Sequence, residues 1–157
     1  RRNLFCKCSR KLHKIMIYVS GIPSTRVDEV WLLCKEYVEM GNNKSHEEMN
    51  IDDIYERLVN AEMQLWLIFN EDSNIQSVLT TEIVIYPRKK TCRIVTLGGK
   101  GLDDWCEEVL ETIEQWAIDN DCVAMETACR KGFIKKLEKY GYEHAYTILG
   151  KELTTIH

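Results

Sequence analysis

Between residues 91 and 128 the chain changes from an extended segment to a helix and back to an extended segment. The first segment, residues 91–97, is rich in β-branched residues and ends at the turn Gly98-Gly99-Lys100-Gly101. Apolar residues then recur every three or four positions to about Asp119, which predicts an amphipathic helix, and residues 122–128 are again apolar. A strand, a helix of this length and a second strand form a crossover, so we expect the two strands to lie parallel in one sheet.

Upstream of this crossover the pattern predicts a strand, two helices and an antiparallel meander. The helices have apolar residues in steps of three and four, and the strands are dense in β-branched and aromatic residues between polar turns. The expected elements are, in order, residues 15–19, 27–40, about 50–59, 64–69, 75–86 and 91–97. The second helix opens near Asn50 with Asp53 three residues on, which is the spacing of a helix cap.

Downstream of the crossover we expect a helix over about residues 131–140, ended by Gly141, and a last strand over residues 146–153. The predicted fold class is therefore α/β, with a mixed sheet in which an antiparallel meander is followed by a parallel strand-helix-strand crossover. Ligand crevices commonly form where strands of such sheets change neighbours. In this chain that place is the turn at residues 98–101.

Charge divides the chain into a short basic segment and an acidic body. The 157 residues suit a single domain. Residues 1–15 hold six Lys or Arg and no acid, which leaves 15 basic against 25 acidic residues in the rest. We expect residues 1–14 to be a basic extension, with a native start at Met16 as one explanation, and residues 15–157 to form the domain. An acidic body argues against non-specific nucleic-acid binding, and the longest apolar runs are too short to span a membrane.

The seven cysteines do not have the regular spacing of a disulfide framework. Most lie inside apolar segments, as small buried residues do. We expect a reducing compartment, the cytoplasm. The pair Cys6-x-Cys8 is too isolated to supply the four ligands of a zinc site, so we expect no metal.

The order of these elements resembles that of the GNAT superfamily of N-acetyltransferases, over about residues 15–153. Residues 93–102 (RIVTLGGKGL) and the following helix with Ile113-Glu114-Gln115-Trp116-Ala117 look like the family's strand, pyrophosphate loop and next helix. Residues 136–142 (KLEKYGY) look like its penultimate helix end. The segment Tyr86-Pro87-Arg88-Lys89-Lys90, with the Leu-Gly-Gly turn, is similar to small GNAT-like proteins of tailed bacteriophages.

This resemblance implies transfer of an acetyl group from acetyl-CoA to an amine on a small molecule or a protein. Backbone amides at the start of a helix suit a pyrophosphate, and a bulge in the preceding strand would direct an amide at the thioester carbonyl. The implied cofactor-binding residues are Leu97, Gly98, Gly99, Lys100, Gly101 and Leu102. Compared with the family, Gly98 stands in place of Arg or Gln in the loop, and Leu137 in place of the tyrosine that protonates the thiolate.

The candidate catalytic bases are Glu82 and Glu126, each an acid within an otherwise apolar strand. Each faces either the crevice, where burial would raise its pKa, or a solvated side of its strand. Asp103 and Asp104 at the predicted helix start either cap the helix or lie against bound phosphates.

Three functions stay open at this point. The first is an N-acetyltransferase in the cytoplasm. The second is a catalytically degenerate GNAT-fold phage protein, which acts as a virion component or as a module that binds another protein. The third is a regulator that binds CoA without turnover. For self-association, a homodimer with two-fold symmetry is the expected form.

Overall fold

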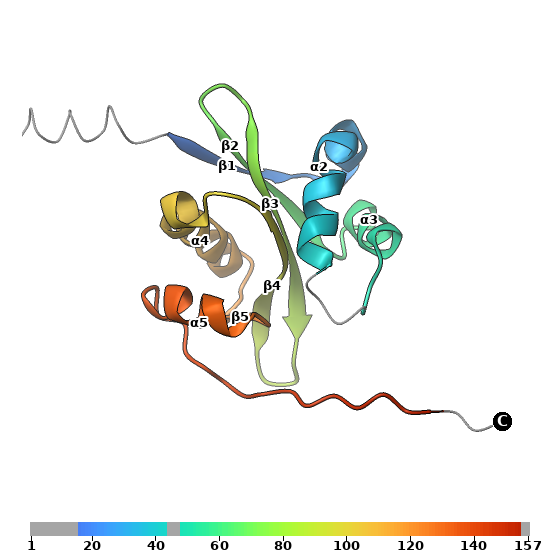
Figure 1. Ribbon diagram of the computed structural model, residues 1–157, viewed down its shortest axis with the longest axis vertical. Coiled ribbons are helices and arrows are strands. Elements are labelled where there is room, and N and C mark those ends of the chain that lie inside the picture. Colours follow the sequence, from blue (N-terminus) through green and yellow to red (C-terminus); the bar gives the residue numbers. More distant parts are fainter. Residues whose placement is uncertain (1–15, 44–47, 155–157) are drawn as a thin grey trace, which may run out of the picture.

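The computed structural model describes residues 16–43 and 48–154, apart from the side chain of Asp104. The predicted basic extension at residues 1–14 lies outside the described residues. Within them, five strands form one sheet in the order β1-β2-β3-β4-β5, and helices cover both of its faces (Figure 1).

Neighbouring strands from β1 to β4 pair antiparallel, whereas β4 and β5 pair parallel. The strands are β1 Ile17–Ile22, β2 Gln64–Asn70, β3 Ile75–Ile85, β4 Lys90–Gly99 and β5 Ala124–Thr127. The structure therefore confirms the predicted α/β class, the meander and the parallel crossover.

The helices form a layer on each side of the sheet. A short 3₁₀ turn, Ser24–Arg26, precedes α2, and the helices are α2 Val27–Asn42, α3 Ile51–Val59, α4 Leu102–Asp119 and α5 Lys131–Glu138. Helices α2 and α3 lie on one face, and α4 and α5 on the other (Figure 1). The sheet separates two apolar cores because side chains alternate along a strand. In β2, Leu65 and Leu67 pack with α2 and α3, whereas Trp66 and Ile68 pack with α4.

Helix α3 begins at the predicted cap. The Asn50 side chain accepts a hydrogen bond from the Asp53 amide at 2.9 Å, and the Asp53 carboxylate accepts one from the Asn50 amide at 2.9 Å. These two bonds satisfy two donors that a helix start leaves without partners.

The expected last strand, residues 146–153, is wrong. Residues 143–154 have no regular secondary structure and leave the domain as an extended tail (Figure 1). Tyr146, Ile148, Leu149 and Leu153 are all exposed, Leu149 to 91%. The segment has β-forming residues, but a strand also needs a neighbour for its backbone hydrogen bonds, and the described chain supplies none here.

Helix α2 and strand β4 approach each other closely through two glycines. A Cβ on Gly41 would lie 2.9 Å from the backbone of Leu97, and a Cβ on Gly98 would lie 1.8 Å from the Tyr37 carbonyl oxygen. Both contacts are with backbone, which cannot rotate away. Gly98 is thus required by helix-strand packing, whatever else it does.

Among the described residues, no helix has the length and hydropathy needed to cross a membrane.

We predict that Gly98→Ala lowers the free energy of unfolding by about 3 kcal/mol or more, because the added methyl overlaps the α2 backbone. The matched control is Gly132→Ala in α5, where a Cβ meets nothing within 4 Å. The control should raise stability by up to about 1 kcal/mol through helix propensity. Urea unfolding followed by circular dichroism measures both. An unchanged unfolding midpoint in Gly98→Ala would contradict the close α2–β4 contact.

Candidate functional site

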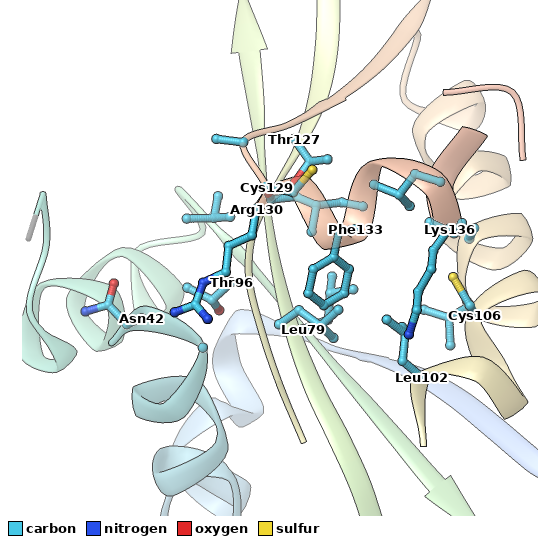
Figure 2. A pocket seen from close by; sticks show the side chains of 18 of the residues that line it. Asn42, Leu79, Thr96, Leu102, Cys106, Thr127, Cys129, Arg130, Phe133 and Lys136 are labelled. Atoms are coloured by element: carbon cyan, nitrogen blue, oxygen red, sulfur yellow. Dashed lines mark hydrogen bonds between the residues drawn. The ribbon is translucent and has the colours of Figure 1, made fainter. Parts of the chain in front are cut away.

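A cavity of about 350 Å³ lies where β4 and β5 part. Their parallel pairing ends at Ile94 and Thr127, while β4 continues to Gly99. The Thr127 hydroxyl donates to the Ile94 carbonyl at 3.1 Å and closes the last paired step. Beyond this step the space is lined by β4, the start of α4, the end of β5, α5 and the end of α2 (Figure 2).

A bulge in β4 places one residue of the strand at this gap. Thr81 pairs with Ile94 and Thr80 pairs with Thr96, so Val95 is the extra residue. The Thr96 amide donates to the Thr80 hydroxyl at 3.2 Å, and the two threonine hydroxyls lie 2.6 Å apart. Val95 lines the cavity. Because an extra residue in a bulge is left out of the ladder, its backbone is the part of β4 that can turn to a ligand.

The six predicted cofactor-binding residues surround the turn but do not all face the cavity. Leu97 and Leu102 line it. Gly98 and Gly99 belong to β4 and lie opposite Val78 and Ser77 of β3.

The turn itself is held by its neighbours on β3 and α4. The Lys100 amide donates to the Gln76 carbonyl at 3.1 Å, and the Lys100 carbonyl accepts from the Trp105 indole at 3.0 Å. Gly99 and Lys100 line a second hollow of about 260 Å³ against α2. The turn is therefore anchored by its hydrogen bonds to β3 and α4.

The start of α4 lies at the cavity, since Leu102 is one of the lining residues. The N-cap residue is Gly101, with φ of 78°, and among the described side chains none caps the helix. The Asp103 carboxylate instead pairs with Lys136 of α5 at 2.9 Å. Both side chains are well exposed, so the pair adds little stability, but it links the two helices at the cavity's edge. The capping role that we expected for Asp103 is thus replaced by an ion pair, and the side chain of Asp104 is outside the described part.

The two candidate bases lie together in a charged cluster. Glu82, Arg93 and Glu126 occupy directly opposed positions on β3, β4 and β5, so they share one face of the sheet. Arg93 donates to Glu82 at 2.9 Å and lies 3.6 Å from Glu126. Tyr86 donates to Glu126 at 2.7 Å, and Arg57 of α3 lies 3.8 Å from Glu82. Neither carboxylate is among the described residues that line the cavity.

Arg93 is the centre of this cluster. Partial burial lowers the pKa of Arg93, but the charge of Glu126 and the bonds to Glu82 and Tyr86 outweigh it and raise the pKa overall. The guanidinium is therefore a permanent charge that holds both carboxylates. A base must come within hydrogen-bond reach of the proton it removes. From these positions Glu82 or Glu126 can act on a ligand in the cavity only through water.

Phenols and thiols near the cavity are poorly suited to acid or nucleophilic chemistry. Leu137, which stands in place of the family tyrosine, lines the cavity. Tyr142 donates to Glu114 at 3.0 Å, and burial raises its pKa. Burial also raises the pKa of Cys129, so this thiol is protonated and weakly nucleophilic at neutral pH. The part of the chain that is described holds no group of three His, Cys, Asp or Glu that could bind a metal ion.

Several lining residues escaped the sequence analysis. Arg130 and Phe133 point into the space from the connection after β5 and from α5, and Asn42 and Thr96 face them from α2 and β4 (Figure 2). The signal that could have found Arg130 is its place just after the last strand of the crossover, where strand ends commonly carry ligand-binding residues. Nothing in the local sequence separates Phe133 from an ordinary helix residue.

No protein-family model matches the sequence, and no curated protein matches it. Solved structures do match the fold. A probable acetyltransferase superposes with a TM-score of 0.65 at 13% identity, over 89% of this chain and 99% of that one. A predicted acetyltransferase from Clostridium acetobutylicum with acetyl-CoA gives 0.63 at 12% identity, over 87% and 96%. The aminoglycoside N-acetyltransferase AAC(6')-Iy in complex with CoA gives 0.65 at 9% identity, over 90% and 97%.

At these identities the likeness concerns the fold alone. The superpositions extend over nearly the whole length of each matched chain. The protein therefore has the fold of the GNAT acetyltransferases.

Proposed function

We propose that the protein is an N-acyltransferase that moves an acetyl group from acetyl-CoA to an amine. The observation that carries the proposal is the cavity between β4 and β5, which lies beside both a bulged residue and an uncapped helix start. Its volume of about 350 Å³ is at the low end for small-molecule sites, so we expect it to take the acyl group and its arm rather than the nucleotide. Two of the structures with this fold hold CoA or acetyl-CoA.

The residues around the cavity suit such a ligand. Leu79, Val109 and Leu110 give it an apolar wall against which an extended chain can pack. The first amides of α4 carry the positive end of the helix dipole, which favours a pyrophosphate. We therefore keep residues 97–102 as the proposed cofactor-binding segment. The bonds from Lys100 to Gln76 and from Trp105 to Lys100 hold this segment in place.

The bulge is the proposed site of carbonyl polarisation. The transfer makes one C–N bond and breaks the thioester C–S bond, while the amine gives up one proton. A coenzyme thioester supplies the activated acyl group. The Val95 amide would donate to the carbonyl oxygen as it gains negative charge, which is where a fixed donor lowers the barrier most.

Glu82 and Glu126 stay our proposed proton acceptors, acting through water. The support is that Glu126 lies on β5, one residue before that strand ends at the gap, and that Glu82 is held beside it through Arg93. Their contacts with Arg93 hold the two carboxylates on either side of one guanidinium.

A specific observation also favours the non-catalytic alternative. Arg93 engages both acids, Tyr142 is bound to Glu114, and a leucine lines the cavity where the family has its tyrosine. A protein of this fold without turnover would bind CoA as a regulator, or bind another protein, for example as part of a phage virion. For location we propose the cytoplasm, supported by free thiols at the five cysteines in the described residues.

We also propose a homodimer in which residues 143–154 of each copy pair with the free edge of β5 of the other. The segment carries four large exposed apolar side chains and no described backbone partner. The β5 edge opposite β4 is unpaired in the described chain. An exposed strand edge and a segment of β-forming residues satisfy each other when they pair.

The acyl-CoA proposal predicts that acetyl-CoA at 100 times its dissociation constant adds about 2.7 kcal/mol of stability, a rise of about 5–10 °C in Tm for a chain of this size. Gly101→Glu should abolish the rise because it puts a negative charge at the proposed pyrophosphate site. Gly141→Glu is the matched control, since it adds the same charge at another glycine of positive φ, away from the cavity. If wild type shows no shift at millimolar acetyl-CoA, the enzyme and the CoA-binding regulator both fail.

If these acids are the proton acceptors, Glu82→Gln or Glu126→Gln should lower kcat by about 10²-fold or more, which is the usual contribution of general-base catalysis. A thiol-release assay with a panel of amines measures the rate. Glu138→Gln, an exposed acid at the end of α5, is the control. Turnover that is unchanged in both variants would remove these two residues from the mechanism.

The dimer predicts that replacing Ile148 and Leu149 together by lysine gives a monomer in light scattering after size-exclusion chromatography. The control replaces Leu32 and Leu33 of α2, which are exposed to 91% and 65% and offer an equal apolar surface elsewhere. A wild-type monomer at all concentrations would contradict the pairing. Loss of the dimer only in the α2 variant would move the interface to that helix.

A further inference from the structure

The main cavity contains one cation that nothing in the described chain neutralises. Its charged lining residues are Glu48, Arg130 and Lys136. Lys136 is paired with Asp103 at 2.9 Å. Arg130 has neither an ion pair nor a hydrogen bond from its side chain to any residue that the structure describes. Among the residues that the structure describes, the guanidinium of Arg130 thus has no partner, and it lines the cavity where a ligand can bind.

Arg130 is fixed at its base and extends across the gap. It follows β5 by three residues and is the N-cap residue of α5, with extended φ and ψ of −70° and 154°. Its side chain runs from the end of β5 toward Thr96 of β4 and Asn42 of α2 (Figure 2). Lys136 and Leu102 lie on the opposite side of the cavity (Figure 2).

The two cations therefore mark different ends of the site. Lys136 stands by the start of α4, where we place the pyrophosphate. Arg130 reaches instead to the strand with the bulge, next to Thr96, which follows Val95 directly. An anion bound by Arg130 lies at the end of the cavity where the acyl group and the amine meet.

A guanidinium suits one anion particularly well. Its planar fork gives two parallel N–H donors that match the two oxygens of a carboxylate. The surrounding wall is largely apolar, through Leu79, Ile94 and Phe133, and an apolar wall strengthens such a pair relative to water. The Thr96 hydroxyl and the Asn42 side chain lie on the side toward which Arg130 points (Figure 2).

We propose that Arg130 binds a carboxylate of the substrate at the reacting end of the cavity. This inference rests on the proposed acyl transfer and narrows its substrate class. The carboxylate belongs either to the acyl group, as in a dicarboxylic acyl thioester such as succinyl-CoA, or to the acceptor, as in an amino acid. The chemistry recognised is the same in both cases, and neutral analogues of either should bind more weakly.

The experiment has two arms, each read as binding by titration calorimetry. The donor arm compares succinyl-CoA with acetyl-CoA. The acceptor arm compares amino acids with their neutral amides in the presence of CoA. We expect the carboxylate-bearing probe to bind about tenfold tighter or more in one of the two arms, the discrimination typical of a charge-assisted hydrogen-bonded pair. Which arm shows the preference identifies the source of the carboxylate.

Variants of Arg130 test whether this residue causes the preference for the carboxylate-bearing probe. Arg130→Gln should reduce the ratio to about one, and Arg130→Lys should give an intermediate ratio because it keeps the charge but loses the fork. Arg88→Gln, in the exposed β3–β4 turn, removes the same charge far from the cavity and should keep the wild-type ratio.

The outcomes separate this inference from the function on which it rests. Binding of acetyl-CoA with no carboxylate preference in either arm overturns the role of Arg130 and leaves acyl transfer standing. If Arg130→Gln still prefers the carboxylate-bearing probe, the role of Arg130 is likewise overturned and acyl transfer still stands. Failure of wild type to bind any of the CoA thioesters overturns both.

Discussion

The brief parallel pairing of β4 with β5 is the constraint on which the rest of the structure depends. It lasts four residue pairs, from Thr91–Ala124 to Ile94–Thr127, while β4 runs on to Gly99. Three contacts hold the continuing part of β4 to its other neighbours: the bulge at Val95, the Thr80–Thr96 bond, and the close approach of Gly98 to α2. Because β4 stays with β3 and α2 while the chain turns from β5 into α5, a space must open between them. The cavity is the direct result.

On the face of the sheet that carries α3, ion pairs take the place of apolar contacts between the strands. Glu82, Arg93 and Glu126 join the three strands just before β4 and β5 part. Removing Arg93 would leave two partly buried carboxylates without the charge they share, which costs more than the loss of one fully exposed pair. The cluster thus stabilises the junction and at the same time limits what its acids can do chemically. If these acids also accept a proton as we propose, structure and catalysis make competing demands on the same two side chains.

The predicted binding segment is not a single surface in space. Residues 97–102 are predicted as cofactor-binding because they resemble the family's pyrophosphate loop, yet of these only Leu97 and Leu102 line the main cavity. Gly98 looks like a phosphate-binding glycine in the sequence, but its missing side chain is explained by the Tyr37 carbonyl of a helix about 60 residues earlier. Arg130 was passed over because a lone arginine after a strand has no local pattern. Arg130 becomes part of a site only because β4, α2 and α5 lie around the same cavity.

By itself the sequence determined the elements from β1 to α5, their order and the parallel crossover, because the periodicity of apolar residues and the length of a connecting helix are local properties. It also located the helix start at Asn50 and the change of strand neighbours near the glycine turn. Tertiary structure alone decided three things: that residues 146–153 lack a partner, that Arg93 binds both candidate bases, and that Arg130 extends into the gap. Each of these depends on which segments meet in space. Backbone pairing and charge neutralisation involve two segments that are distant in the chain, and so does the lining of a cavity, so the sequence of one segment cannot show them.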